Sequence, residues 1–191
     1  MNQRKGKIFV VSGPSGAGKG TLIRALLRKV PDISYSVSVT TRKRREGEEE
    51  GKDYFFVSEE EFKRMIENEE LLEWAYVHNH WYGTPKKWVE DLISQGRDVL
   101  LELDVQGAIR VKEMFPESVL VFIKPPSRKS LIDRLKKRST ENEQEMKVRL
   151  ETAEKELTME DAYDYCIVND DVDTATGELV KIVQKERGVL M

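Results

Sequence analysis

The chain has 191 residues, of which 39% are hydrophobic and 35% charged, and its formal net charge is −3. This composition is typical of a folded globular protein, and the near balance of charge gives no general attraction to nucleic acid or to an acidic membrane. The single cysteine, Cys166, excludes an internal disulfide, and its apolar neighbours predict a buried thiol in a reducing compartment. The N-terminal segment shows no secretory or membrane-spanning pattern, so a cytoplasmic location is expected.

Strands and helices are predicted to alternate along most of the chain. In the first part of the chain we expect a strand at 8–11, a helix from about 22, a strand at 33–40 and a loop at 41–53. A strand at 54–57, a helix at 58–68, an apolar stretch at 71–77, a turn at 81–84 and a helix at 85–96 follow. The remainder is predicted to contain strands at 99–104, 119–123 and 166–168 and helices at 107–115, 127–138, 143–160 and 174–186. Ser58 followed by Glu61 is a capping box that opens its helix. The alternation predicts a parallel sheet covered on both faces. Residues 35–84 interrupt it with hairpin-like strands, and residues 128–156 form a charged helical excursion.

The turn after the first strand has the pattern of a phosphate-binding loop. Glycines at 13, 16 and 18 let successive N–H groups converge on an anion, and Lys19 adds a mobile charge that can reach the outer phosphates. The alternative is a tight turn in which glycine serves backbone geometry alone, and the lysine argues against it. Gly20 stands where a hydroxyl normally ligates Mg²⁺. The hydroxyl comes one residue later, at Thr21, and whether it substitutes stays open.

Charged residues elsewhere suggest further parts of a site. Asp104 ends an apolar strand, where a P-loop protein places the carboxylate that holds Mg²⁺ waters; the alternative is a solvated strand end. The basic cluster 42–45 precedes an acidic run, 46–51, which favours a compact dianion such as a monophosphate over a polyanion, with a solvated loop as the alternative.

The predicted helical excursion carries Arg134, Arg138 and Arg149. These side chains could deliver charge to a transferring phosphoryl group, or could simply form i,i+4 pairs on a solvated helix face. His78 and His80 form a spaced pair, but no further ligand completes a set, so no structural metal site is expected.

The motifs together resemble those of guanylate kinases, which are P-loop nucleoside monophosphate kinases. The blocks that carry the resemblance occur in order between about residues 6 and 187, at 13–19, 36–42, 51–56, 72–75, 82–84, 104–107 and 167–170. The resemblance implies an α/β fold: a P-loop kinase core with a parallel sheet flanked by helices, an inserted mixed-β lobe that binds GMP, and a helical lid. The implied boundaries are 1–34, 85–127 and 157–191 for the core, 35–84 for the lobe and 128–156 for the lid.

The resemblance further implies transfer of a phosphoryl group from ATP to GMP, a step of purine nucleotide metabolism, with Mg²⁺ as cofactor. Mg²⁺ would be held through nucleotide phosphates and waters, with Asp104 in its outer shell and no direct protein ligand. The implied catalytic residues are Lys19, Arg138, Arg149 and Asp104. The implied ATP-binding residues are Gly13, Ser15, Gly16, Ala17, Gly18, Lys19, Gly20, Thr21 and Asn169. The implied GMP-binding residues are Ser38, Arg42, Arg45, Tyr54, Glu73, Tyr82, Thr84 and Glu102.

The chemistry of guanine agrees with the position of Glu73. Guanine presents adjacent N1–H and N2–H₂ donors that one carboxylate accepts together, whereas adenine would leave that carboxylate unpaired. The alternative is that Glu73 is a solvated strand residue. The expected partners are the small molecules ATP and GMP, without nucleic acid or membrane, and the oligomeric state stays open. Another nucleoside monophosphate kinase, or a non-catalytic guanylate-kinase-like binding module, remains the alternative function; the intact Lys19 loop argues against the module.

Overall fold

The computed structural model describes residues 4–77, 79–138 and 143–189, except for the side chains of residues 137, 138, 143 and 145. His78 and the side chain of Arg138 therefore lie outside the described part of the chain. Within that part, no helix has both the length and the apolar character needed to cross a membrane.

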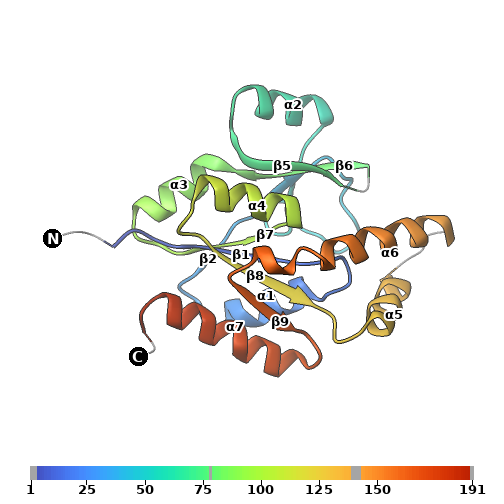
Figure 1. The fold of residues 1–191 in the computed structure, drawn as a ribbon. Helices are drawn as coiled ribbons and strands as arrows, with labels where there is room; N and C mark the ends of the chain where they lie inside the picture. Colours follow the sequence, from blue (N-terminus) through green and yellow to red (C-terminus); the bar gives the residue numbers. More distant parts are fainter. Residues whose placement is uncertain (1–3, 78, 139–142, 190–191) are drawn as a thin grey trace.

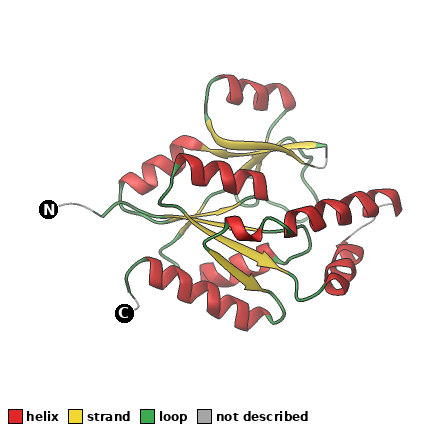
Figure 2. Ribbon diagram, in the orientation of Figure 1, coloured by secondary structure: helices red, strands yellow, loops and turns green. Residues whose placement is uncertain are grey.

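The core is a five-stranded, wholly parallel sheet with helices on both faces, as the alternation of elements predicted (Figures 1 and 2). The strands, in spatial order, are β2 (Ser34–Tyr35), β7 (Val99–Glu102), β1 (Ile8–Ser12), β8 (Val119–Lys124) and β9 (Tyr165–Val168). Helices α1 (Lys19–Lys29) and α7 (Val172–Glu186) cover one face, and α3 (Lys86–Ser94) and α4 (Val105–Met114) cover the other.

Strand β1 shows why both faces must be covered. Successive side chains of a strand point to opposite faces, and all five residues of β1 are buried. Phe9 and Val11 pack in the cluster formed with α1 and α7, whereas Ile8 and Val10 pack in the cluster formed with α3 and α4. A continuous apolar run is what a strand buried on both faces requires.

The inserted lobe is a second, four-stranded sheet of mixed direction, as expected from the resemblance. Its order is β4 (Tyr54–Phe56), β3 (Ser38–Thr40), β6 (His80–Pro85) and β5 (Leu71–Val77), with β3 parallel to β4 and antiparallel to β6. Helix α2 (Glu59–Glu67) buries Phe62 against this sheet, where its ring stacks on Trp81 at a centroid distance of 5.9 Å. The Ser58 cap is confirmed, because its Oγ accepts from the Glu61 N–H at 3.1 Å.

Three local predictions were wrong. The run 33–40 forms two strands, because Ser34 pairs with Val99 in the core sheet whereas β3 pairs within the lobe. Residues 81–84 lie inside β6 instead of forming a turn, because β5 supplies an antiparallel partner. Cys166 is exposed. It lies on the edge strand β9, where Ile167 points into the core and its neighbours alternate outward.

The helical excursion forms a small unit of its own beside the core sheet (Figure 1). Helix α5 (Arg128–Arg138) and helix α6 (Glu143–Leu157) pack through the buried side chains of Leu131, Leu135 and Ala153. A short 3₁₀ helix, Glu160–Ala162, returns the chain to β9. The two helices agree with the prediction for this stretch, apart from the last residues, since α6 ends at Leu157.

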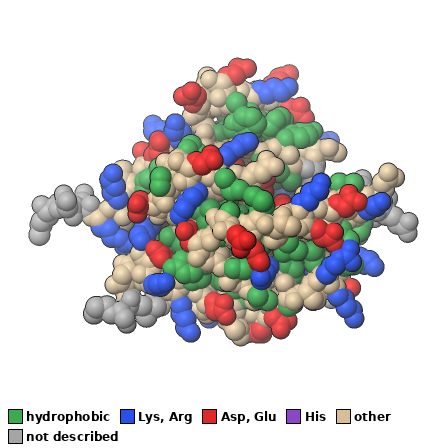
Figure 3. Space-filling view, in the orientation of Figure 1, with side chains coloured by type: hydrophobic (Ala, Val, Ile, Leu, Met, Phe, Trp, Pro, Cys, Tyr) green, Lys and Arg blue, Asp and Glu red, His purple; other side chains and the backbone are tan. Residues whose placement is uncertain are grey.

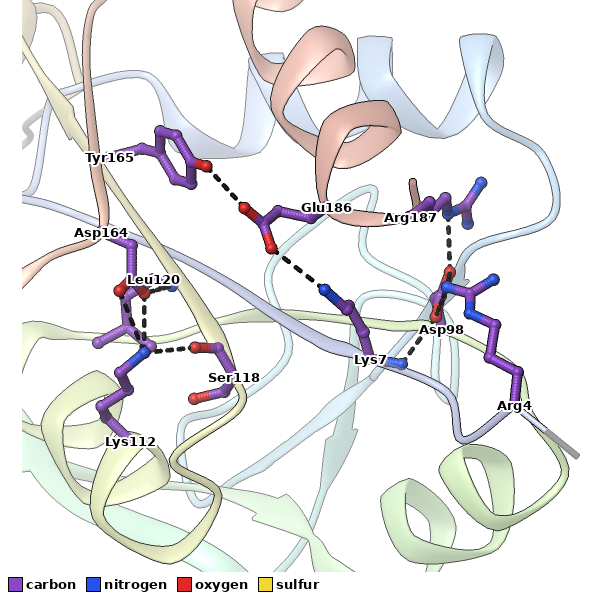
Figure 4. Close-up of polar contacts among 10 residues, drawn as sticks. All are labelled: Arg4, Lys7, Asp98, Lys112, Ser118, Leu120, Asp164, Tyr165, Glu186 and Arg187. Carbon is purple, nitrogen blue, oxygen red and sulfur yellow. Dashed lines mark hydrogen bonds and ion pairs between the residues drawn. The ribbon is translucent and has the colours of Figure 1, made fainter. Parts of the chain in front are cut away.

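A polar network joins the two ends of the described chain to the start of β7 (Figure 4). The buried carboxylate of Asp98 accepts from the Arg187 Nε at 2.7 Å, from the Arg4 guanidinium at 3.0 Å and from the Lys7 backbone N–H at 2.7 Å. Glu186 accepts from Lys7 at 3.1 Å and from the Tyr165 hydroxyl at 2.6 Å. On the face drawn in Figure 3, cationic and anionic side chains are interspersed, without a broad area of one sign.

Candidate functional site

The loop between β1 and α1 has a backbone that only glycine can adopt at its key positions. Gly13 and Gly18 have φ values of 135° and 93°, in the left-handed region. A Cβ at Gly13 would lie 2.1 Å from the carbonyl oxygen of Ile123, and one at Gly18 would lie 2.3 Å from Nδ2 of Asn169. The Lys19 Nζ donates to the Gly13 carbonyl at 2.6 Å. The loop therefore curls around its own lysine, between a strand and a helix as the sequence predicted.

Asn169 supports this loop from behind. The side-chain Nδ2 of Asn169 donates to the Ala17 carbonyl at 2.8 Å, and the backbone carbonyl of Asn169 accepts from the Arg134 guanidinium of α5 at 2.8 Å. Asn169 is only 3% exposed, and its buried Oδ1 has no hydrogen-bond partner in the described structure. Asn169, which the resemblance placed among the ATP-binding residues, is thus held against the loop, and α5 is bonded to the same residue.

A cavity of about 270 Å³ opens beside the loop and collects residues from four parts of the chain. The loop contributes Gly13, Ser15, Gly16, Gly18, Lys19 and Gly20; the lobe contributes Ser38, Tyr54, Glu73, Ala75, Val77, Tyr82 and Gly83; the end of β7 and the residues after it contribute Glu102, Leu103 and Asp104; helix α6 contributes Arg149, Thr152 and Glu156. Most of the residues predicted for ATP and GMP therefore meet at one place. Among the described residues that were predicted for the site, those that do not line this cavity are Ala17, Thr21, Arg42, Arg45, Thr84 and Asn169.

Glu73 is a buried carboxylate that lines the cavity. It is 6% exposed, and burial raises its pKa to about 7, with a further contribution from the charge of Asp104. The Thr84 hydroxyl donates to Oε1 at 2.8 Å and works in the opposite direction, as does the charge of Arg110. Pairing of β5 with β6 places Glu73 directly opposite Thr84. The interpretation of Glu73 as a solvated strand residue is therefore wrong.

A second group in the lobe centres on Arg42, which is 8% exposed. Its guanidinium carbon lies 5.3 Å from the centroid of the Tyr54 ring, and Tyr54 meets Tyr82 edge to face at 6.0 Å. Both terminal nitrogens of Arg42 donate to the carboxylate of Glu48, at 3.0 and 2.6 Å, and the backbone N–H of the exposed Arg45 donates to the same carboxylate at 2.8 Å. Four of the predicted GMP-binding residues, Arg42, Arg45, Tyr54 and Tyr82, thus lie together, with the Glu48 carboxylate bonded to the Arg42 guanidinium.

Sequence reasoning missed this role of Glu48. The acidic run 46–51 was interpreted only as a barrier to polyanions. A carboxylate six residues after an arginine, across a glycine-containing turn, was nevertheless a usable signal for a local ion pair.

Two carboxylates stand at the end of β7 beside the loop. Asp104 caps α4, because its Oδ1 accepts from the Gly107 N–H at 2.7 Å. Glu102 accepts from the Tyr35 hydroxyl at 3.5 Å. A Cβ added at Gly20 would lie 3.8 Å from Oε2 of Glu102. No group of three or more His, Cys, Asp or Glu residues that could hold a metal ion occurs in the described residues.

Helix α6 presents Arg149, Thr152 and Glu156 to the cavity. Their i, i+3, i+7 spacing puts them on one helix face, a signal that would have found Glu156 from the sequence. Burial raises the pKa of the Glu156 carboxyl group, and the charge of Lys19 opposes that shift, as does the backbone N–H of Ser15. An anion from α6 therefore already lies at the loop that was predicted to bind phosphate.

Comparison with known proteins gives one consistent result. A family model described as guanylate kinase matches residues 5–186. A guanylate kinase from Caldanaerobacter subterraneus subsp. tengcongensis is 51% identical over 97% of this chain and 90% of its own length, and one from Thermotoga maritima is 48% identical over 96% and 88%. A crystal structure of guanylate kinase from Anaplasma phagocytophilum, 40% identical, superposes with a TM-score of 0.80 over 95% of this chain and 86% of that one.

Proposed function

Because the chain belongs to the guanylate kinase family, it is an ATP:GMP phosphotransferase, and we propose how its residues share that activity. The observation that supports the proposal best is the shared cavity: the phosphate-loop lysine, the buried Glu73 carboxylate and Arg149 of α6 all line it. A binding module without catalysis would need no Lys19 at the loop. The two nucleotides would meet where these three groups converge.

On the acceptor side, Glu73 reads the guanine base. Its ionised carboxylate accepts from guanine N1–H and N2–H₂, while the Thr84 hydroxyl keeps one oxygen in place. Ser38 and Glu102 also line the cavity and would complete the surroundings of the base. Adenine has no donor at N1, so an adenine nucleotide would leave the buried carboxylate unpaired, which is costly.

The GMP phosphate binds at Arg42, Arg45, Tyr54 and Tyr82. Arg42 presents two N–H groups to a carboxylate in this structure, and the same bidentate geometry suits a phosphate. Glu48 then either shares Arg42 with the incoming dianion or moves aside. Two tyrosine hydroxyls beside the guanidinium add neutral donors.

On the donor side, the loop amides and Lys19 bind the ATP phosphates, with Arg149 and Arg138 neutralising charge on the transferring group. Asn169 and Arg134 hold the loop in its binding shape. Phosphoryl transfer asks the protein for positioning and charge stabilisation, with little covalent work, and these groups supply that.

Mg²⁺ fits this donor set as a partner of the nucleotide. Asp104 lines the cavity together with the loop and Lys19, and Mg²⁺ is commonly held by one or two carboxylates together with substrate phosphates. Asp104 would act through waters, because one of its oxygens already caps α4. The cation would neutralise phosphate charge. A cytoplasmic location, where both nucleotides are available, belongs to the same proposal.

We also assign 35–84 as the GMP lobe and 128–156 as a lid on a core made of the remaining residues. Both segments contribute side chains to the cavity, so they would close on bound nucleotides. Amide hydrogen exchange with and without ATP and GMP analogues tests this, and equal exchange in both states would contradict it.

The test of the function is an ADP-release assay with ATP and, in turn, GMP, AMP, CMP and UMP. We expect turnover with GMP to exceed turnover with the others, and chelation of Mg²⁺ to abolish it. Faster turnover with another monophosphate would assign the chain to a different nucleoside monophosphate kinase activity. Binding of GMP without turnover would favour a non-catalytic module.

A further inference from the structure

Gly107, in the first turn of α4, is buried against Glu73. A Cβ added at Gly107 would lie 2.7 Å from Oε2 of Glu73 and 3.2 Å from its carboxyl carbon. The first distance is shorter than side chains tolerate. The opposite oxygen, Oε1, accepts from Thr84 at 2.8 Å. The carboxylate is thus enclosed between a hydroxyl on one side and a bare α-carbon on the other.

The backbone of α4 does not itself require glycine at this position. Gly107 is a helical residue whose φ lies outside the left-handed region, unlike Gly13 or Gly18. Its N–H donates to the Asp104 cap, which any residue except proline can do. Within a helix, glycine is less favourable than alanine, because its backbone loses more conformational freedom on folding. The helix would therefore be more stable with alanine here, unless the space is needed.

Helix α4 cannot easily move away to make that space. The Arg110 guanidinium donates to the Trp74 carbonyl and lies 5.4 Å from the centroid of the Trp74 ring. Leu72 of β5 belongs to the same buried cluster as Ala108 of α4. The strand that carries Glu73 is thus fixed to the helix on both sides of the carboxylate. A methyl group at 107 would displace the carboxylate before it displaced the helix.

We propose that Gly107 is a specificity-determining position: its missing side chain lets the Glu73 carboxylate lie at the depth where both oxygens meet the guanine donors. This rests on the proposed role of Glu73. A methyl group would push Oε2 toward the cavity and strain the bond from Thr84, so guanine N1–H and N2–H₂ would lose their aligned acceptors. Gly107 touches no substrate and acts as a positioning residue.

The test is Gly107→Ala, with Gly177→Ala of α7 as the matched control. Both replace a helical glycine, and a Cβ at Gly177 meets nothing within 4 Å. Gly107→Ala should raise KM for GMP about 5- to 100-fold, the range for one bidentate base contact. The KM for ATP should stay unchanged, and the melting temperature should stay unchanged or rise slightly. The preference for GMP over IMP, which lacks the 2-amino group, should fall. Gly177→Ala should change neither KM nor this preference.

Glu73→Gln separates this inference from the function on which it rests. If Glu73→Gln raises KM for GMP and Gly107→Ala does not, Glu73 still reads guanine and the role of Gly107 is overturned. If Gly107→Ala lowers the melting temperature and raises both KM values together, the glycine serves packing alone and the proposal fails. The double variant should show no more than about a twofold rise in KM for GMP beyond Glu73→Gln, because both changes remove the same contact. A double variant whose KM for GMP rises by the product of the two single-variant factors would refute the proposal.

Discussion

The buried carboxylate of Glu73 makes the stability of this protein depend on pH in a way that one substitution should remove. Burial raises its pKa from the ordinary value of 4.5 to about 7. The folded protein therefore holds a proton on Glu73 between these values, where the unfolded chain has already released it. The resulting stabilisation is fully present below about pH 4.5 and is lost as the pH rises through about 7. At 1.36 kcal/mol per pKa unit, the difference corresponds to roughly 3 kcal/mol.

The assay is urea unfolding of the nucleotide-free protein at several pH values between 5 and 8. Glu73→Gln keeps the size of the side chain and an acceptor for Thr84 but cannot ionise. The free energy of unfolding of the variant relative to the parent should therefore rise by about 2.5 kcal/mol from pH 5 to pH 8, since part of the difference is already lost at pH 5. Glu90→Gln, on the exposed side of α3, is the control and should follow the parent at every pH. If the two glutamine variants show the same pH profile, the buried, proton-holding state of Glu73 is refuted.

Three further outcomes are expected. Lys19→Ala should lower kcat by about 100-fold or more and leave the melting temperature close to that of the parent, since the lysine faces the cavity; near-normal turnover would remove it from the mechanism. Asp98→Asn should cost about 3 kcal/mol in urea unfolding, because Arg187 loses its buried ionised partner and keeps only the exposed Asp32, with kcat retained; an unchanged midpoint would contradict the structural role of the network in Figure 4. Glu156→Gln should lower KM for ATP several-fold, because it removes a carboxyl group that lines the cavity beside Lys19, where the phosphates would bind; a higher KM would mean that this carboxylate helps ATP to bind.

The sequence by itself determined the features that depend on near neighbours in the chain. Glycine spacing together with Lys19 defines the phosphate loop, since the required backbone and the charge lie within a few residues. The Ser58–Glu61 cap formed for the same reason. The alternation of strands and helices predicted the parallel core sheet and the helical excursion, and the resemblance to guanylate kinases added the mixed lobe sheet.

Only the tertiary structure decided which residues pair, which are buried and which share the cavity. The run 33–40 divides between two sheets because its first half pairs with β7, where Val99 lies opposite Ser34, and its second half pairs with β4, where Tyr54 lies opposite Ser38. Both partners are distant in sequence. Cys166 is exposed because β9 ends the sheet, a fact that its apolar neighbours cannot reveal. The contact of Gly107 with Glu73 joins residues that are far apart in the chain. The space available to an atom depends on all the residues that pack around it, whereas a sequence pattern describes only the neighbours along the chain. Such a contact is therefore decided by the tertiary structure alone.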